Sequence, residues 1–575
     1  MKKNDIYKLM LAGAFVLLLA ACEKQVSPVE PENDDAPVVR TEKVSVKTES
    51  DTKVTLVGTT FAWEDGDEIA VWTGTADNTG SYQDCEVTDG KITVTLTDGA
   101  SRRNYAIYPA SVKDASNYGQ GTLNVKLPAS YSYADIRDNK TPLPMVAVND
   151  SDDLTFYNVA GLLRITVKAI PSDATGLVFQ FPGKKVNGTF TVTNPGTTEP
   201  SIATASPETT GEEKITVSFP AKTYTELTLN IPLPTGVYED VFITPVGSAT
   251  KVGSARHIKA GGYTAARAHG RQLTATLVSF TVAAGTPGKK VIFAPGNLQA
   301  IIASYDDETK LATASSWKFA DTQYSTVVDL GPEDKSFTMS FAAGKTVDLF
   351  SYQGVSSEKS AFYGLCTVYS SSSPTEAQIS ACKAYYGNND EEGLKADWGT
   401  LAIGSYATNT WATPSSPEFN YLFTERTGAS TVGTTENALW AKVSICDHYG
   451  LLIFPDVYTH PEGVTVPNAI NRSLANWEAV TNYDSSAWTK IEAAGAVFLP
   501  VGGQRSSTNV TVGSTAGVNK VGFYMTSTST TKNSTTSEGK FKGLRFQGQD
   551  VNTNFDGSNG NKRHTGGSVR LYHVL

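Results

Sequence analysis

The sequence predicts a mainly β protein, with two β-sandwiches in tandem followed by an α+β domain. Short runs in which apolar and polar residues alternate recur through residues 40–275, where amphipathic helical spacing hardly occurs. Charged residues make up only 18% of the 575 residues, and Gly, Ser, Thr and Asn are frequent, which favours strands joined by turns. From Val278 onward polar loops with scattered tryptophans replace this pattern, which indicates a domain of another type.

The first sandwich is expected over residues 40–150. The Asp65-Gly66 pair stands between two apolar-aromatic segments, a pattern typical of a β-hairpin turn. The short spacing of the strands leaves little room for crossover helices, so the sheets should be mainly antiparallel. Strands are predicted over residues 41–46, 91–96, 104–109 and 122–127.

The second sandwich is expected over residues 151–277, after the proline-rich stretch 142–145. Its first segment, residues 154–167, carries a long apolar pattern, and turn clusters separate the later ones. Strands are also predicted over 188–193, 214–219, 226–231 and 241–244, and the α+β domain is expected over 278–575, with short helical pieces near 374–386 and 475–479.

The segment 1–21 predicts a secretory signal peptide, because lysines precede a short apolar run that ends in small residues. The run is shorter than the roughly 20 apolar residues that cross a bilayer. Cys22 follows Leu19-Ala20-Ala21, which resembles the lipobox of bacterial lipoproteins, in which the cysteine is acylated and becomes the mature N-terminus. An ordinary signal peptide with a chance cysteine is the alternative. Residues 22–39 hold three prolines and an excess of acids, which predicts a lipidated, flexible tether.

The formal net charge is −10, and it becomes about −12 without the signal segment, which has three lysines and one aspartate. An acidic chain with no basic tract argues against nucleic acid as a partner, and against binding an anionic bilayer through the protein surface. The five cysteines form no C-x-x-C pair, so a structural zinc site is not expected, and neither is a cofactor.

An ordered set of segments between Phe61 and Gly236 resembles the fimbrillin family of Bacteroidales. The set consists of F-A-W-E-D-G-D-E-I-A-V at 61–71, I-Y-P at 107–109, L-P at 127–128, P-M at 144–145, the run 154–167 and I-P-L-P-T-G at 231–236. The resemblance implies two transthyretin-like β-sandwiches on a lipidated precursor that assembles into, or anchors, surface fimbriae. It also implies that an arginine-specific cut removes a first strand, so that a neighbouring subunit can donate a strand in its place. Arg40 is the candidate cleavage site, and a plain linker arginine is the alternative.

The C-terminal part resembles the C-type-lectin-like domain of Fibrobacter and Bacteroidales major paralogous surface proteins, a relative of the formylglycine-generating enzyme fold. The segments that carry the resemblance are 290–299, 317–320, 347–350, 397–399, 419–426, 450–455, 495–500, 523–527, 543–546 and 566–572. Arg505 and Arg570 match family positions, where structural pairing is expected. Inserted loops around 303–316 and 528–540 depart from the family pattern. The cysteine pair of the formylglycine-generating relatives cannot be placed here, so that activity is not carried over.

No catalytic site is expected. The six histidines form no metal-binding spacing, and Cys446 and Asp447 would point to opposite faces if their segment were extended. Asn552, Asn554 and Asp556 imitate the start of a calcium loop, but Arg563 stands at the twelfth position in place of a bidentate Glu. A turn-rich polar loop is the simpler interpretation.

Six of the eight tryptophans lie in the C-terminal domain, where an exposed ring could stack on a sugar. Most should be core, and Trp398 and Trp411, in looser sequence, are the candidates for a ligand-binding face. Together these features predict a fimbrial adhesin, of the tip or accessory type, anchored in the outer membrane by acyl chains such as palmitate. Its expected partners are membrane lipid, other fimbrial subunits by strand exchange, and a host or bacterial glycan or protein. A stand-alone glycan-binding lipoprotein that does not polymerise is the alternative.

Overall fold

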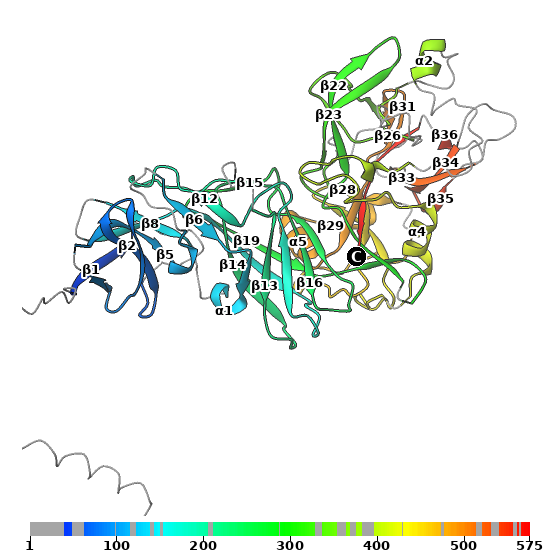
Figure 1. Cartoon of the computed structure of the whole chain (residues 1–575). Helices are drawn as coiled ribbons and strands as arrows, with labels where there is room; N and C mark the ends of the chain where they lie inside the picture. Colours follow the sequence, from blue (N-terminus) through cyan, green and yellow to red (C-terminus); the bar gives the residue numbers. More distant parts are fainter. Residues whose placement is uncertain are drawn as a thin grey trace, which may run out of the picture.

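The structure is a computed structural model. It describes residues 39–48, 63–97, 99–114, 122–137, 143–149, 153–204, 211–286, 288–327, 336–352, 364–367, 375–381, 396–427, 429–472, 476–512, 520–530, 540–555, 561–562 and 565–575. The predicted signal segment, Cys22 and nearly all of the tether lie outside the described residues. The prediction of a mainly β chain is confirmed. Figure 1 shows an elongated molecule, with β1 and β2 at one end, the C-terminal domain at the other, and the second sandwich between them.

The first unit is a seven-stranded sheet in the order β3-β2-β5-β8-β9-β1-β4. It rolls around one apolar core, and its two edges meet where the Thr95 amide donates to Gln83 Oε1 at 3.1 Å. Strand β4 shows why the sequence folds this way, because Ile92 and Val94 alternate with polar residues and are buried while those residues are exposed. Its elements are β1 (Arg40–Thr48), β2 (Glu68–Ala76), β3 (Thr79–Glu86), β4 (Lys91–Leu96), β5 (Ser101–Tyr108), the 3-10 helix η1 (Ala110–Val112), β8 (Met145–Val148) and β9 (Leu154–Asn158).

The turn predicted at Asp65-Gly66 forms, with Gly66 at a φ of +95°, but it does not join the hairpin that was expected. Among the described residues β2 pairs with β3 and β5, and the tight turn between β2 and β3 lies at Asp77-Asn78. Trp63 instead packs its ring edge-on against Tyr108 and Phe156. The aromatic residue before the turn therefore closes the core rather than pairing as a strand.

The second unit is a sandwich of a five-stranded sheet, β17-β16-β11-β13-β7, and a three-stranded sheet, β14-β10-β19, with an apolar core between them. Most neighbours are antiparallel as predicted, whereas β10 with β19 and β13 with β7 run parallel. Its elements are β6 (Asn124–Leu127), β7 (Ser130–Ser132), α1 (Tyr133–Ile136), β10 (Gly161–Lys168), β11 (Gly176–Gln180), β12 (Gly188–Thr191), β13 (Lys214–Ser218), β14 (Glu226–Leu233), β15 (Gly236–Tyr238), β16 (Asp240–Val246), β17 (Ser254–His257), β18 (Tyr263–Ala265) and β19 (Gly270–Thr276).

The two sandwiches exchange strands, so one boundary at 150/151 does not separate them. Strands β6 and β7, which precede that point, pair with β12 and β13 of the second unit. Strand β9, which follows it, pairs with β8 and β1 of the first unit. A shared apolar cluster around Trp72, Phe190 and Leu162 joins the two units, so they should behave as one stiff rod.

The two ends of the C-terminal domain lie in one sheet. Its second strand, β21, pairs with the first strand, β20, on one side and with the last strand, β38, on the other. Among its sheets, the β22–β23 hairpin covers the predicted insertion at 303–316 and projects from the domain in Figure 1. The predicted helical pieces correspond to α2 and η5, whereas α5 was not predicted.

The bounds of the C-terminal elements are β20 (Phe280–Ala283), β21 (Lys289–Phe293), β22 (Leu298–Asp306), β23 (Leu311–Phe319), β24 (Ser336–Thr338), β25 (Thr346–Val347), β26 (Phe350–Ser351), α2 (Glu376–Ala381), η3 (Trp398–Thr400), α4 (Ser416–Asn420), the π-helical turn η4 (Tyr421–Glu425), β27 (Trp440–Ile445), β28 (His448–Ile453), η5 (Trp477–Ala479), β29 (Thr481–Tyr483), α5 (Ser485–Ala493), β30 (Val497–Pro500), β31 (Gln504–Ser506), β32 (Asn509–Thr511), β33 (Val521–Thr530), β34 (Lys540–Gln547), β35 (Asp550–Phe555), β36 (Asn561–Lys562), β37 (Gly566–Gly567) and β38 (Tyr572–Val574).

Two buried arginines hold the loops of this domain together. Arg570 is fully buried and donates to Asn297 Oδ1 at 2.9 Å and to the Phe498 carbonyl at 2.7 Å. Arg505, also fully buried, donates to the Leu349 carbonyl at 2.9 Å. The structural role expected for both residues is therefore observed. Within the described part of the chain, no helix has the length and apolarity required to cross a bilayer.

Candidate ligand-binding cleft

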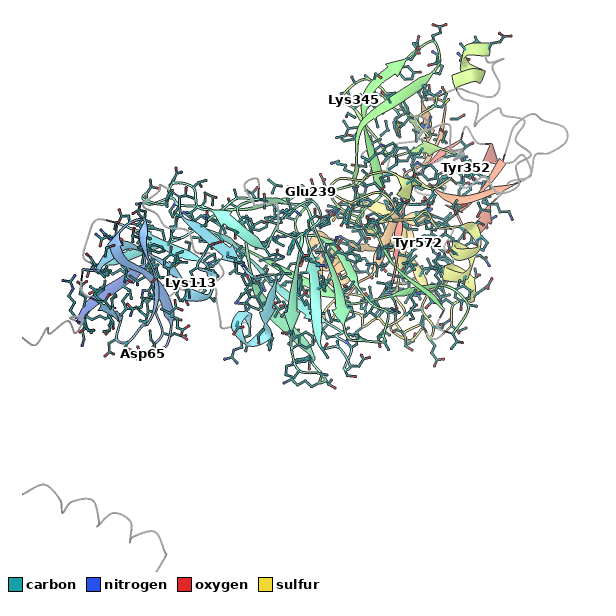
Figure 2. All side chains as sticks on the ribbon, in the orientation of Figure 1. Asp65, Lys113, Glu239, Lys345, Tyr352 and Tyr572 are labelled. Atoms are coloured by element: carbon teal, nitrogen blue, oxygen red, sulfur yellow. The ribbon has the colours of Figure 1, made fainter. Side chains whose placement is uncertain are left out.

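The second sandwich and the C-terminal domain are joined by direct contacts between side chains. Arg256 on β17 forms an ion pair with Glu492 on α5 at 2.8 Å, and Thr276 Oγ1 donates to the Ala493 carbonyl at 2.7 Å. Phe242 on β16 packs edge-on against His573, with ring centroids 4.9 Å apart. Figure 2 shows Glu239 where the two parts meet, far from Asp65 at the other end of the molecule.

His257, at the end of β17, makes hydrogen bonds on both sides of this junction. Its Nδ1 lies 2.5 Å from Asp240 Oδ1, and its Nε2 lies 2.8 Å from the carbonyl oxygen of Ala320 in the C-terminal domain. Both neighbours accept hydrogen bonds, so the doubly protonated ring satisfies both at once. Burial lowers the pKa of His257, but the Asp240 charge and the two hydrogen bonds outweigh it, and the pKa lies above its ordinary value.

A cleft of about 1080 Å³ opens beside these contacts. Residues of β17 and β19 and the start of the loop after β10 form one wall, and α5 with the loops around 321–324 and 457–462 forms the other. This volume lies just above the roughly 300–1,000 Å³ of sites that enclose drug-sized ligands. Residues of both domains line the cleft, so it requires both of them.

Helix α5 supplies much of the C-terminal wall. Asp484 caps the helix by accepting from the Ala487 amide at 2.7 Å, and Trp488 and Ile491 turn into the core. The remaining faces leave Thr489 and Lys490 exposed on the cleft. The Asp484 cap followed by Trp488 and Ile491 at helical spacing is a signal from which the helix could have been predicted.

The tryptophan prediction is corrected by the structure. Trp398 is fully buried and Trp411 is 3% exposed, so neither ring face is open to a sugar. The main chain of Gly399 passes so close to Trp411 that a Cβ atom at Gly399 would overlap the Trp411 carbonyl. Trp411 also packs edge-on against Tyr406 and Phe319. The polar sequence around the two tryptophans suggested exposure, but contacts with residues that are distant in the sequence bury both side chains.

The calcium prediction is not supported by the described part of its segment. Asn552 and Asn554 lie within strand β35, paired with β34, whereas a calcium loop must curl around its ion. Asp556 lies outside the described residues. Within those residues, no group of three or more His, Cys, Asp or Glu side chains is placed to hold a metal ion.

Cys446 and Asp447 form a tight turn between β27 and β28 rather than a strand. Both have positive φ values, 48° and 66°, as a two-residue hairpin turn requires. Burial raises the pKa of the Cys446 thiol, which disfavours the thiolate needed for nucleophilic catalysis. Cys85 and Cys446 form no disulfide, Cys366 is buried, and Cys382 lies outside the described residues.

Arg40 is exposed and is the first residue of β1. Strand β1 lies inside the sheet, antiparallel to β4 and parallel to β9. A cut after Arg40 would therefore leave residues 41–48 in their sheet. A segment that such a cut would remove precedes Arg40 and lies, apart from Val39, outside the described residues, so the removal of a first strand stays a prediction.

Comparisons with known proteins give few matches. A scan against models of known protein families finds none, and a search of curated proteins also finds none. Among solved structures, a Bacteroides ovatus protein named for a proposed role in cell adhesion is 15% identical, with a TM-score of 0.27. The match covers 42% of this chain and 92% of that one.

Two further solved structures are fimbrial proteins. The tip fimbrial protein Mfa3 from Porphyromonas gingivalis, truncated at its C-terminus, is 10% identical over 39% of this chain and 82% of its own, with a TM-score of 0.18. A fimbrial protein from Bacteroides ovatus is 9% identical over 92% of this chain and 99% of its own, with a TM-score of 0.19. TM-scores this low do not establish a shared fold, so the function proposed below rests on the chain's own sequence and contacts.

Proposed function

We propose that this chain is a lipid-anchored adhesin of the bacterial outer membrane, in which the sandwiches form a stalk and the C-terminal domain binds. The observation that carries the proposal is the order of the parts along the elongated molecule. Strand β1, the first described element after the predicted anchor at Cys22, lies at the opposite end from the C-terminal domain (Figure 1). Acylation of Cys22 would hold the first unit near the membrane and present the other end outward.

The binding end is supported by two features. The C-terminal sequence resembles C-type-lectin-like domains, and a cleft of about 1080 Å³ lies where this domain meets the second sandwich. The partner proposed is a glycan or a protein on another surface.

Incorporation into a fimbrium, as a tip or accessory subunit, is the finer form of this proposal. A cut after Arg40 keeps residues 41–48 paired with β4 and β9, so a strand that leaves would come from residues before the cut. The second candidate is a stand-alone glycan-binding lipoprotein that does not polymerise.

The anchoring proposal is tested with Cys22→Ala in the producing bacterium. We expect the unchanged chain to incorporate labelled palmitate, to fractionate with the outer membrane and to be degraded when intact cells are treated with protease. Cys22→Ala should lose the label and leave the membrane fraction, whereas Cys85→Ala should change neither property. Label or membrane retention in Cys22→Ala would contradict the proposal.

The fimbrial form is tested by arginine-specific proteolysis of the purified mature chain. Cleavage after Arg40 followed by concentration-dependent polymers would support strand exchange. A chain that is cut after Arg40 and stays monomeric would favour the stand-alone candidate. Arg40→Gln, which keeps β1, is the matched control for the cut.

A further inference from the structure

The cleft between the two domains carries positive charge that the protein does not neutralise. Lys259 and Arg271 on the sandwich wall and Lys490 on α5 are exposed and line the cleft. None of the three forms an ion pair with any residue that the structure describes. In a chain with a formal net charge of −10, these three cations are available to attract an anionic ligand into the cleft.

The acidic side chains of the cleft are, by contrast, mostly neutralised. Glu492 is held by Arg256 at 2.8 Å and accepts from Gln323 Nε2 at 3.1 Å. Asp321 forms an ion pair with Lys318 at 3.2 Å. Only Glu462, in the exposed loop 457–462, remains as an acid without an ion pair among the described lining residues. The cleft therefore presents a net positive charge to a ligand.

Arg271 is oriented to bind an oxyanion through two parallel hydrogen bonds. Its Nε donates to the Ile258 carbonyl at 3.2 Å, which fixes the guanidinium plane on strand β19. The terminal nitrogens remain available, and their fork geometry matches the two oxygens of a carboxylate or sulfate group.

The uncharged lining fits a saccharide better than an extended peptide. Thr322, Thr459 and Thr489 line the cleft together with the half-buried Tyr324. Strand β19 is the edge of its sheet, where a peptide would add as a further strand. However, the carbonyl of Thr274 on that strand already accepts from Arg256 Nη1 at 2.9 Å. A ligand held through side chains avoids competition for that group.

We propose that this cleft binds an anionic oligosaccharide, with Lys259, Arg271 and Lys490 pairing its carboxylate or sulfate groups. The inference rests on the proposed role in attachment, and it names the ligand class of that role. The volume of about 1080 Å³ gives room for several sugar rings rather than one.

The test uses the full mature chain with Cys22→Ser, so that lipid does not affect solubility. Calorimetry measures binding of a heparin hexasaccharide, a hexagalacturonate, uncharged maltohexaose and hexaglutamate. We expect at least one anionic saccharide to bind, and to bind more tightly than maltohexaose and hexaglutamate. The combined variant Lys259→Gln, Arg271→Gln, Lys490→Gln should weaken that binding by roughly 30-fold, because three charge-assisted contacts are lost.

The matched control replaces three exposed lysines outside the cleft, Lys43→Gln, Lys126→Gln and Lys345→Gln, with the same change in charge. This control should bind within twofold of the unchanged chain. Equal weakening in both variants, tighter binding of hexaglutamate, or no preference for an anionic saccharide would each overturn the proposal. Because this measurement does not depend on the anchor, its failure is distinct from failure of the Cys22→Ala experiment.

Discussion

Removing the imidazole of His257 should loosen the joint between the second sandwich and the C-terminal domain. The ring links Asp240 of the sandwich to the Ala320 carbonyl of the C-terminal domain at 2.5 and 2.8 Å. His257→Gln cannot satisfy both acceptors from the same position. The variant leaves Asp240, whose side chain is 6% exposed, without its cationic partner.

The expected cost follows from what remains buried. Breaking a buried ion pair on one side destabilises a protein by about 3–5 kcal/mol, because the other charge is left unpaired. The His257 side chain is 17% exposed, so solvent compensates part of this loss and we expect the lower value, about 3 kcal/mol. The exposed His269 on the same sandwich provides the control, since His269→Gln removes an imidazole without exposing a buried acid.

The effect should depend on pH in a defined direction. The pKa of His257 is raised in the folded chain, so its stabilising contribution is fully present below the unfolded-state pKa of about 6.5. The contribution is lost as the pH rises through the higher folded-state pKa. Urea unfolding followed by tryptophan fluorescence should therefore show the largest gap between the unchanged chain and His257→Gln near pH 6.

The difference in free energy of unfolding between the unchanged chain and His257→Gln should decrease from pH 7 to pH 8 and again to pH 9. His269→Gln should follow the unchanged chain throughout. A gap that stays constant from pH 6 to pH 9 would show that the protonated ring does not carry the stabilisation. A loss below about 0.5 kcal/mol at pH 6 would refute the buried-pair argument altogether.

Three further predictions concern the described core and joint. Arg570→Lys removes a fully buried planar group with several neutral acceptors, so the free energy of unfolding should fall by about 3 kcal/mol in urea titration, and an unchanged midpoint would contradict this. Burial lowers the pKa of Lys442 to about 8, so the free energy of unfolding should rise as the pH goes from about 8 toward about 10.4, the pKa in the unfolded chain. Urea titrations at both ends of this range should show that rise in the unchanged chain and its loss in Lys442→Met. Gly183 has a φ of +69°, and a Cβ atom there would lie 2.6 Å from Ser405 Cβ, whereas Gly261 has a φ of +71° and open space around it. Gly183→Ala should therefore lower the free energy of unfolding by about 1 kcal/mol more than Gly261→Ala does, as measured by thermal unfolding. Equal effects would show that Ser405 does not pack there.

Strands could be predicted where one local rule decides the structure. Residues 91–96 alternate in hydrophobicity, and β4 has those bounds. The assignment of β6 and β7 to the second sandwich could not be predicted, because their partners β12 and β13 follow only after four other strands, β8 to β11, along the chain. The local sequence of a short strand does not determine which distant strand it will pair with.

The candidate site was missed for the same reason. Trp398 and Trp411 lie in loose sequence, yet long-range packing buries them. The cations of the cleft come from segments far apart in the sequence, since Arg271 lies on β19 and Lys490 on α5. A site formed by two domains leaves no local spacing to detect, and only the folded joint brings its charges together.

The charge of the whole chain and the charge of the cleft act in opposite directions on an anionic ligand. The net charge of −10 repels a polyanion from most of the surface, which weakens unspecific binding. Within the cleft, Glu492 and Asp321 are paired while Arg271 and Lys490 are not, so the cleft attracts an anionic ligand. Specificity then depends on the joint, because the cleft keeps both walls only while contacts such as that of His257 hold the domains together.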